Sequence, residues 1–345
     1  MRMYEYIIRR SVLLIFVLFG VSLITFYLSR GFPSAFNPCA PYITTKMSVT
    51  QIHNVCASHG FYLPLYEQYF YWLRDVLTGN WGSAGTWAQG LPVMSVFASR
   101  FPYTVELAIS AVIVTVVVGL PLGIISAVRN NKPVDHASRV VALTGISTPV
   151  YWFGFILQLV FFYYFIRWGL PHLPNQGALS TNEATITTYT GIPIIDGLLN
   201  ADWGYAWDAF IHVILPSITL AFASLGALTR LVRASMLEVL RQDYITLARS
   251  KGLSERVVIF RHALRNALIP ALTVAGLLFA GLLGGAVITE TVFNWPGVGF
   301  DSVRAVLQGD SNFVMLYTLV TALIVVVANL VVDVLYAVVD PRIRY

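Results

Sequence analysis

The amino-acid sequence predicts an all-α, polytopic membrane protein with six transmembrane helices. Hydrophobic residues make up 57% of the 345 residues and charged residues only 11%, whereas soluble domains carry about 25% charged residues. Six stretches lack Asp, Glu, Lys and Arg for long enough to cross a hydrocarbon core, which takes about 20 residues. These stretches are residues 11–29, 107–128, 140–166, 209–229, 266–289 and 311–332.

The distribution of Lys and Arg predicts how these spans are oriented. With the N-terminus inside, 16 of the 22 basic residues lie on the cytoplasmic side and six lie outside. We therefore expect a multi-pass protein of the cell membrane, plasma or inner, with both termini cytoplasmic. The net charge of +5 then suits inner-leaflet lipid and cytoplasmic partners, and it gives no support to nucleic-acid binding.

The spans are spread along the whole chain, so we expect one membrane domain with a sizeable outer loop. Residues 1–29 form a basic lead and the first transmembrane helix. That span is too long for the apolar region of a signal peptide, which runs to about 15 residues. Residues 30–100 form an extracellular region, and residues 101–345 form a five-helix core that includes a cytoplasmic loop at 241–265.

The extracellular region contains an amphipathic helix and both cysteines. The helix is predicted by apolar residues at helical spacing, namely Tyr66, Tyr69, Phe70, Leu73 and Leu77. Cys39 and Cys56 both face an oxidising side under this topology. They either close a disulfide or remain two unpaired thiols.

The next spans carry a few residues that are unusual inside a membrane. Glu106 lies at the outer edge of the second span, and Pro149 lies in the middle of the third. Proline is tolerated there because neighbouring groups can satisfy the freed carbonyl. The outer loop at 170–208 matches no motif. The fourth span continues as a helix past Arg233 toward the cytoplasmic loop.

The last two spans contain small residues, a turn and an acid. Gly281 and Gly285 in the fifth span form a small-x-x-x-small face that allows close helix approach. Trp295, Pro296 and Gly297 belong to a turn after this span. The sixth span continues into Asp333, and intramembrane acids are candidates for function.

A polar, basic stretch at residues 243–270 separates the fourth and fifth spans. Tyr244, Leu247 and Ala248 fall at i, i+3 and i+4 and predict a helical turn with an apolar face. Gly252 is placed to end this turn in the left-handed conformation. Ser254 is then a candidate N-cap for a second, amphipathic helix.

This stretch resembles the cytoplasmic coupling loop of the dipeptide/oligopeptide ABC importer permeases, which are binding-protein-dependent transport system inner membrane components. The family pattern Y-I-x-x-A-R-x-K-G-L-x-x-x-x-x-x-x-H-A-L-R-N-A-L-I-P is matched from Tyr244 to Pro270. The broader importer superfamily has Glu-Ala-Ala before the glycine, whereas this chain has Thr246, Leu247 and Ala248. That departure resembles the peptide branch more than the sugar branch.

The resemblance implies a type I ABC importer permease fold that forms half of a translocation pore. It implies ATPase-coupling roles for Tyr244, Ala248, Arg249, Lys251, Gly252, Leu253, Ser254, Arg256, Arg261 and His262. It also suggests pore or gate candidates, which are Glu106, Pro149, Tyr151, Trp152, Glu290, Trp295, Pro296 and Gly297. The implied partners are a second paralogous permease, two ABC ATPase subunits and an extracellular substrate-binding protein.

The chain itself lacks the motifs of a nucleotide-binding or metal enzyme. It has no G-x-x-x-x-G-K-[ST] phosphate loop and no Cys/His metal spacing. We therefore expect no catalytic residue, metal or cofactor in this chain, and ATP and Mg would be used by the partner ATPase subunits. The resemblance favours peptides as substrates, although members also carry oligosaccharides or metal complexes.

Two other classes of function stay open at this point. A proton-coupled secondary transporter would use Glu106, Glu290 or Asp333, but it would need inverted repeats, which the motif order lacks. An intramembrane or receptor-like structural protein is the third alternative.

Overall fold

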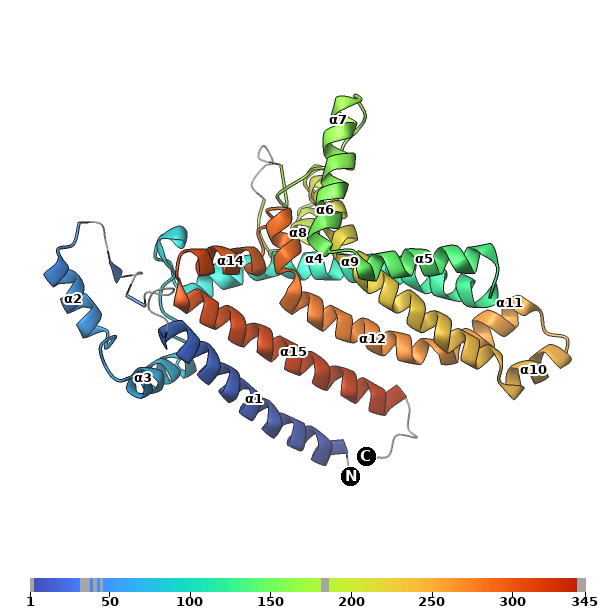
Figure 1. Cartoon of the computed structure of the whole chain (residues 1–345), viewed down its shortest axis with the longest axis horizontal. Helices are drawn as coiled ribbons and strands as arrows, with labels where there is room; N and C mark the ends of the chain where they lie inside the picture. The colour runs from blue at the N-terminus through green and yellow to red at the C-terminus, as the bar shows by residue number, and fades with distance from the viewer. Residues whose placement is uncertain (1–2, 32–37, 40–41, 44–45, 181–185, 340–345) are drawn as a thin grey trace. The chain divides into compact units, whose positions relative to one another are not determined.

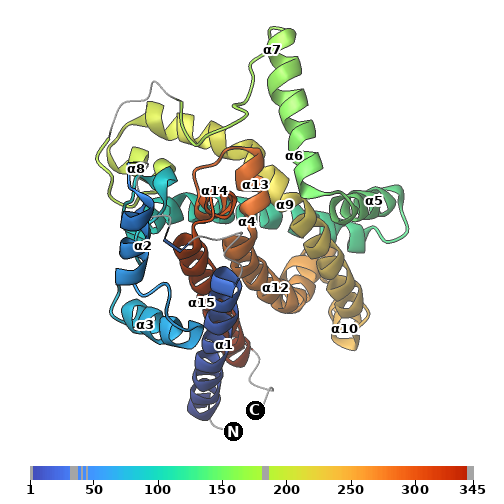
Figure 2. The same ribbon diagram turned by 60° about the vertical axis from the view of Figure 1, so that its left-hand side comes forward.

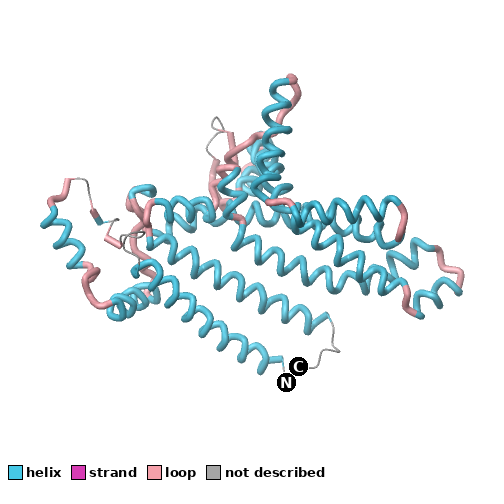
Figure 3. Tube along the Cα trace, in the orientation of Figure 1, coloured by secondary structure: helices cyan, strands magenta, loops and turns pink. Residues whose placement is uncertain are grey.

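The computed structural model describes residues 3–31, 38–39, 42–43, 46–180 and 186–339. These residues form helices joined by loops, and no strand occurs among them (Figures 1 and 3). The all-α prediction is therefore confirmed. The chain divides into two compact units, one built from residues 1–104 and 296–327, the other mainly from residues 105–295.

The first unit is organised around the contact between α1 (Met3–Gly31) and α3 (Leu65–Leu77). Phe26 of α1 is fully buried and packs edge-on against Tyr69 of α3, with 5.3 Å between ring centroids. Met315 of α15 (Ser311–Val339) completes this cluster. α3 is the predicted amphipathic helix, and it packs on α1 through Tyr69, with Trp72 and Leu73 beside it. Tyr66, Phe70 and Leu77, which were expected on the same apolar face, are exposed.

A helix cap, a disulfide and a buried carboxylate hold the loops of this unit in place. α2 (Val49–Ser58) begins with a capping box between Ser48 and Gln51. Cys39 and Cys56 are joined in a disulfide. The carboxylate of Asp310 accepts hydrogen bonds from the backbone N–H of Gly85 and from the indole N–H of Trp87. Asp310 thereby attaches the loop before α4 (Val93–Val128) to the start of α15. It lies between α14 (Val298–Leu307) and α15 in the sequence.

The second unit is organised around α9 (Trp203–Leu240), which contacts α5 (Pro133–Ser147), α6 (Val150–Gln158), α8 (Pro193–Leu199) and α12 (Leu264–Gly285). Glycines allow α5 to lie directly against α9. A Cβ added at Gly145 would come within 2.6 Å of the Phe222 carbonyl oxygen, and one at Gly226 would overlap the Ala142 carbonyl.

The remaining elements of the second unit are short. They are α7 (Phe165–Arg167), α10 (Asp243–Ser250), α11 (Glu255–Val257) and α13 (Val287–Val292), together with π-helical turns at Leu159–Tyr164 and Val258–Ala263.

The predicted third span was wrong as a single helix. Residues 140–166 divide between α5, which ends at Ser147, and α6, which begins at Val150. Thr148 between them has extended backbone, with φ −87° and ψ 126°. The residue before a proline is pushed out of the helical region by the proline ring, and Pro149 therefore divides the helix.

Among the described residues, five helices are long and apolar enough to cross a membrane. They are Val12–Gly31, Val93–Val128, Val150–Arg167, Trp203–Leu240 and Ser311–Val331. The second and fourth begin before the predicted boundaries, because a helix can continue through polar residues that end an apolar stretch. The predicted fifth span corresponds to the 22-residue α12. The burial of Gly285 and the side chain of Asp333 lie outside what the structure describes.

Candidate functional site

The loop between α9 and α12 is a helical elbow. α10 begins at Asp243 and ends at Ser250, and Gly252 follows with a left-handed φ of +76°. The Gly252 N–H donates to the Arg249 carbonyl at 2.9 Å, which closes the end of the helix. The predicted glycine elbow is confirmed. α9, α10 and α12 lie close together in both ribbon views (Figures 1 and 2).

The elbow is anchored by apolar side chains on one face of α10. Ile245 and Ala248 are buried in a cluster with Val232 and Met236 of α9 and Val258 of the π-helical turn. We expected Tyr244, Leu247 and Ala248 to form the apolar face. Of these three only Ala248 is buried. Ile245, three residues before it on the same side of the helix, is buried with it in the cluster shared by α9 and the π-helical turn.

The elbow also carries apolar side chains that no other part of the described chain covers. Tyr244, Leu247, Leu253 and Phe260 are exposed, with 56% of Leu247 and 61% of Phe260 accessible. We call these four residues the loop patch. An apolar patch rimmed by polar residues is typical of a protein interaction site.

Basic residues surround the loop patch. Lys251, Arg256 and Arg261 are exposed, and His262 is half-buried. Arg249 donates from Nε to a Glu255 carboxylate oxygen at 2.8 Å, and this ion pair joins α10 to α11. Ser254 occupies the N-cap position of α11, but its hydroxyl makes no capping hydrogen bond.

The tyrosine at the start of the loop patch is also held in place. The Asn266 side-chain amide donates to the Tyr244 hydroxyl at 2.8 Å. Asn266 belongs to α12, so this hydrogen bond ties both sides of the elbow together.

A charge cluster that the sequence did not predict lies between α5 and α9. Asp135 has no exposed surface, and its carboxylate accepts from Arg233 Nε at 2.7 Å and Nη2 at 2.9 Å. The Ser126 hydroxyl and the Asn131 backbone N–H also donate to it. These hydrogen bonds, chiefly that from Arg233, hold the pKa of Asp135 well below its usual range. The residues are distant in sequence, so no local pattern could reveal the pair.

The pore and gate candidates are distributed over several elements. Glu106 is buried in α4, and its carboxylate accepts the backbone N–H of Ile194 at 3.0 Å. Glu290 and Trp295 are fully buried in and after α13. The other five candidates lie at or just before helix starts: Pro149, Tyr151 and Trp152 at the start of α6, and Pro296 and Gly297 before α14. Tyr151 and Trp152 are exposed on the surface of α6.

Comparison with known proteins places almost the whole chain within one group. The family described as "Binding-protein-dependent transport system inner membrane component" matches residues 119–345, and the N-terminal family of such membrane components matches residues 3–108. The di/tripeptide transport system permease protein of Pseudomonas aeruginosa (strain UCBPP-PA14) is 40% identical and is aligned over 99% of each chain.

Two further relatives show the same extent of similarity. The dipeptide transport system permease protein of Escherichia coli (strain K12) is 36% identical over 99% of each chain. The oligopeptide transport system permease protein of Bacillus subtilis (strain 168) is 34% identical over 99% of this chain and 100% of the relative.

Proposed function

The chain belongs to the family of binding-protein-dependent transport system inner membrane components, and from this premise we propose that it forms half of the pore of a peptide-importing ABC transporter. In this role it is a permease subunit that conducts substrate and does not itself hydrolyse ATP. Its cytoplasmic loop would transmit the motion of separate ATPase subunits to the membrane helices.

The loop patch is the observation that carries the coupling role. A soluble ATPase can move membrane helices only through a protein contact, so it needs a surface that is both accessible and rigidly joined to them. The loop patch is accessible. Ile245, Ala248 and Val258 of the same elbow are buried in a cluster with Val232 and Met236 of α9. Docking on the patch would therefore displace α9 and α12 together.

The proposed substrate class rests on the relatives. Three proteins that align with nearly the whole chain are called di/tripeptide, dipeptide and oligopeptide permeases. Di- and oligopeptides are accordingly the substrates proposed here.

The proposed assembly contains more subunits than this chain. One chain would supply half of the pore, a paralogous permease the other half, and two ATPase subunits would bind ATP and Mg. An extracellular binding protein would deliver the peptide. The N- and C-termini would be cytoplasmic, which puts the elbow on the ATPase side and the Cys39–Cys56 disulfide on the oxidising side.

Uptake into proteoliposomes tests the proposal. The complete transporter, reconstituted with its binding protein and ATPases, should accumulate a labelled dipeptide when ATP is supplied, and a protonophore should not prevent this. Uptake that ignores ATP and collapses with the protonophore would assign the chain to the secondary transporters. Transport-competent assemblies of this chain alone, detected by native mass measurement, would contradict the proposed subunit composition.

A further inference from the structure

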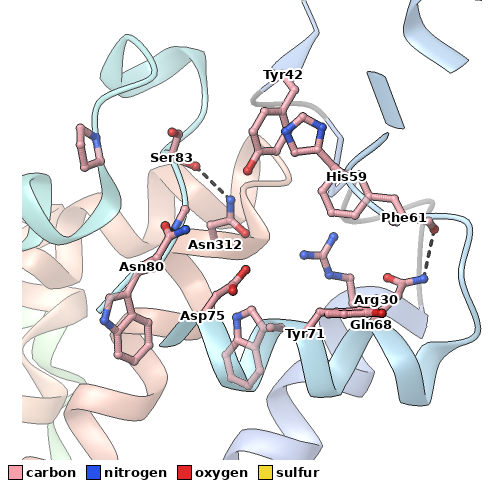
Figure 4. A pocket seen from close by; sticks show the side chains of 15 residues that line it. Arg30, Tyr42, His59, Phe61, Gln68, Tyr71, Asp75, Asn80, Ser83 and Asn312 are labelled. Carbon is pink, nitrogen blue, oxygen red and sulfur yellow. Dashed lines mark hydrogen bonds between the residues drawn. The ribbon is translucent and has the colours of Figure 1, made fainter. Parts of the chain in front are cut away.

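We infer that α1, α3 and α15 form a binding site for a phospholipid with an ethanolamine headgroup. The headgroup would occupy a polar cavity of about 460 Å³ in the first unit. Polar residues that line it include Arg30, Gln68, Asp75, Asn80, Ser83 and Asn312 (Figure 4). Aromatic rings, among them Tyr71, Trp72 and Trp81, form other parts of the wall.

Arg30 is the group that points to an anion. It lies in the last turn of α1, and Figure 4 shows its guanidinium group pointing into the cavity. Its Nε and Nη1 atoms are buried and donate no hydrogen bond in the structure, while the guanidinium lies 4.8 Å from the ring centre of Phe61. A buried cation is costly unless an anion neutralises it. A phosphate diester offers oxygens that a guanidinium binds strongly.

Asp75 restricts which anion fits. Its carboxylate lines the same cavity as Arg30, and its ion pair in the described chain is with the neighbouring, exposed Arg74 at 3.2 Å. A lone phosphate would be repelled by Asp75, whereas a headgroup that also carries an ammonium group would be attracted to it. The Asn312 amide nitrogen donates to the Ser83 carbonyl at 3.0 Å, so its amide oxygen is the atom that can accept from an ammonium.

An apolar groove adjoins the polar cavity and indicates that the ligand is a lipid. The groove has a volume of about 430 Å³ and is lined by Phe19, Leu73, Leu319 and Leu323, among other residues of α1, α3 and α15. Trp72 and Trp81 line both the groove and the polar cavity, so the two spaces share a wall.

The position along α1 agrees with a lipid. The groove begins at Ile15 and lies along the span Val12–Gly31, whereas Arg30 lies at the end of that span, where headgroups are found. Soluble phosphoethanolamine would make contacts in the cavity and none in the groove, so it would bind much more weakly than a phospholipid. A phospholipid would place its headgroup between Arg30 and Asp75 and one acyl chain in the groove.

Native mass spectrometry of the full chain with defined lipids tests the headgroup contacts. Wild-type protein should retain dioleoyl-phosphatidylethanolamine in preference to dioleoyl-phosphatidylglycerol. Arg30→Gln should reduce retention of the ethanolamine lipid about tenfold, which is the effect of losing one charge-assisted contact. Asp75→Asn should abolish the preference between the two lipids. Lys46→Gln is the matched control, because Lys46 is an exposed basic residue of the same unit that does not line the cavity.

A second variant tests the acyl chain without touching the headgroup residues. Leu323→Trp fills the groove and should reduce lipid retention, while soluble phosphoethanolamine and inorganic phosphate should not compete with the lipid. Thermal unfolding of each variant verifies that it folds. The inference is overturned if Lys46→Gln matches Arg30→Gln or if wild type retains both lipids equally. It is also overturned if Leu323→Trp retains lipid normally or if either soluble compound displaces the lipid.

Discussion

Arg233 binds both carboxylate oxygens of Asp135, with Nε 2.7 Å from Oδ1 and Nη2 2.9 Å from Oδ2. Asp135 lies in the first turn of α5, and Arg233 lies near the C-terminal end of α9. Asn130 also accepts a hydrogen bond from Arg233 at 2.9 Å. The ion pair therefore attaches the turn between α4 and α5 to the helix that leads into the elbow.

Asp135→Asn should destabilise the protein by about 3 to 5 kcal/mol, because it leaves a largely buried guanidinium without its counter-charge. Arg249→Gln breaks the exposed Arg249–Glu255 pair instead and should cost at most about 1 kcal/mol. Unfolding by denaturing detergent measures both changes. An equal loss of unfolding free energy in the two variants would mean that burial does not strengthen the Asp135–Arg233 ion pair.

Asp301 should make the folded protein less stable as pH rises. A carboxylate whose pKa is lowered by an ion pair has the opposite effect. Burial raises its pKa, and Arg100 and Arg304 offset part of that rise. The folded protein then holds this proton up to a higher pH than the unfolded chain does. Stability should fall as pH rises from the unfolded pKa of about 4 through the raised folded pKa.

Unfolding measured across this pH range in wild type and Asp301→Asn tests that effect. The variant cannot lose the proton, so its unfolding free energy should fall less steeply with pH than that of wild type. Identical slopes would show that Asp301 titrates the same way in the folded and unfolded states.

The close approach of α5 and α9 should tolerate no side chain at Gly226. An alanine Cβ there would overlap the Ala142 carbonyl. Forcing the helices apart should cost about 1 to 3 kcal/mol. Gly20→Ala in α1 is the control, since its added Cβ meets no atom within 4 Å. Thermal stability that is unchanged in Gly226→Ala would mean that the two helices separate freely.

Gly252→Val should reduce ATP hydrolysis that is coupled to transport. An added Cβ would meet no atom within 4 Å, so the cost arises from the left-handed φ of +76° and amounts to about 1 to 2 kcal/mol. Gly79 is equally open, with a φ of +87°, but lies after α3. Gly79→Val should therefore carry a similar strain and retain coupled hydrolysis. Loss of coupling in both variants would indicate general destabilisation.

The sequence predicted the features that depend on composition and local spacing. The all-α class follows from long apolar stretches, and the Gly252 elbow follows from a glycine placed directly after helical periodicity. The division at Thr148 was missed, because proline inside a membrane helix is compatible with both a continuous and a broken helix. The burial of Ile245 was missed because Ile245 and Leu247 lie on different sides of α10, and only packing against α9 and the π-helical turn decides which side is covered.

Pairs that are distant in sequence were beyond prediction. In the sequence, Arg233 and Asp135 each read as an ordinary charged residue near the end of an apolar stretch. Asp310 likewise reads as a residue before a helix, although it holds Gly85 and Trp87. Their partners are set by how the helices pack, which local spacing does not encode.

Co-purification of the ATPase subunit with the membrane-inserted chain tests whether the loop patch is the surface on which the ATPase docks. Leu247→Asp places a charge in the loop patch, and Leu307→Asp places one at a residue that is 80% exposed on α14, outside the elbow. Burying a carboxylate against an apolar partner is unfavourable, so Leu247→Asp should lose most of the bound ATPase. Leu307→Asp should retain it. Normal ATPase recovery with Leu247→Asp would contradict the assignment of the loop patch as the coupling surface.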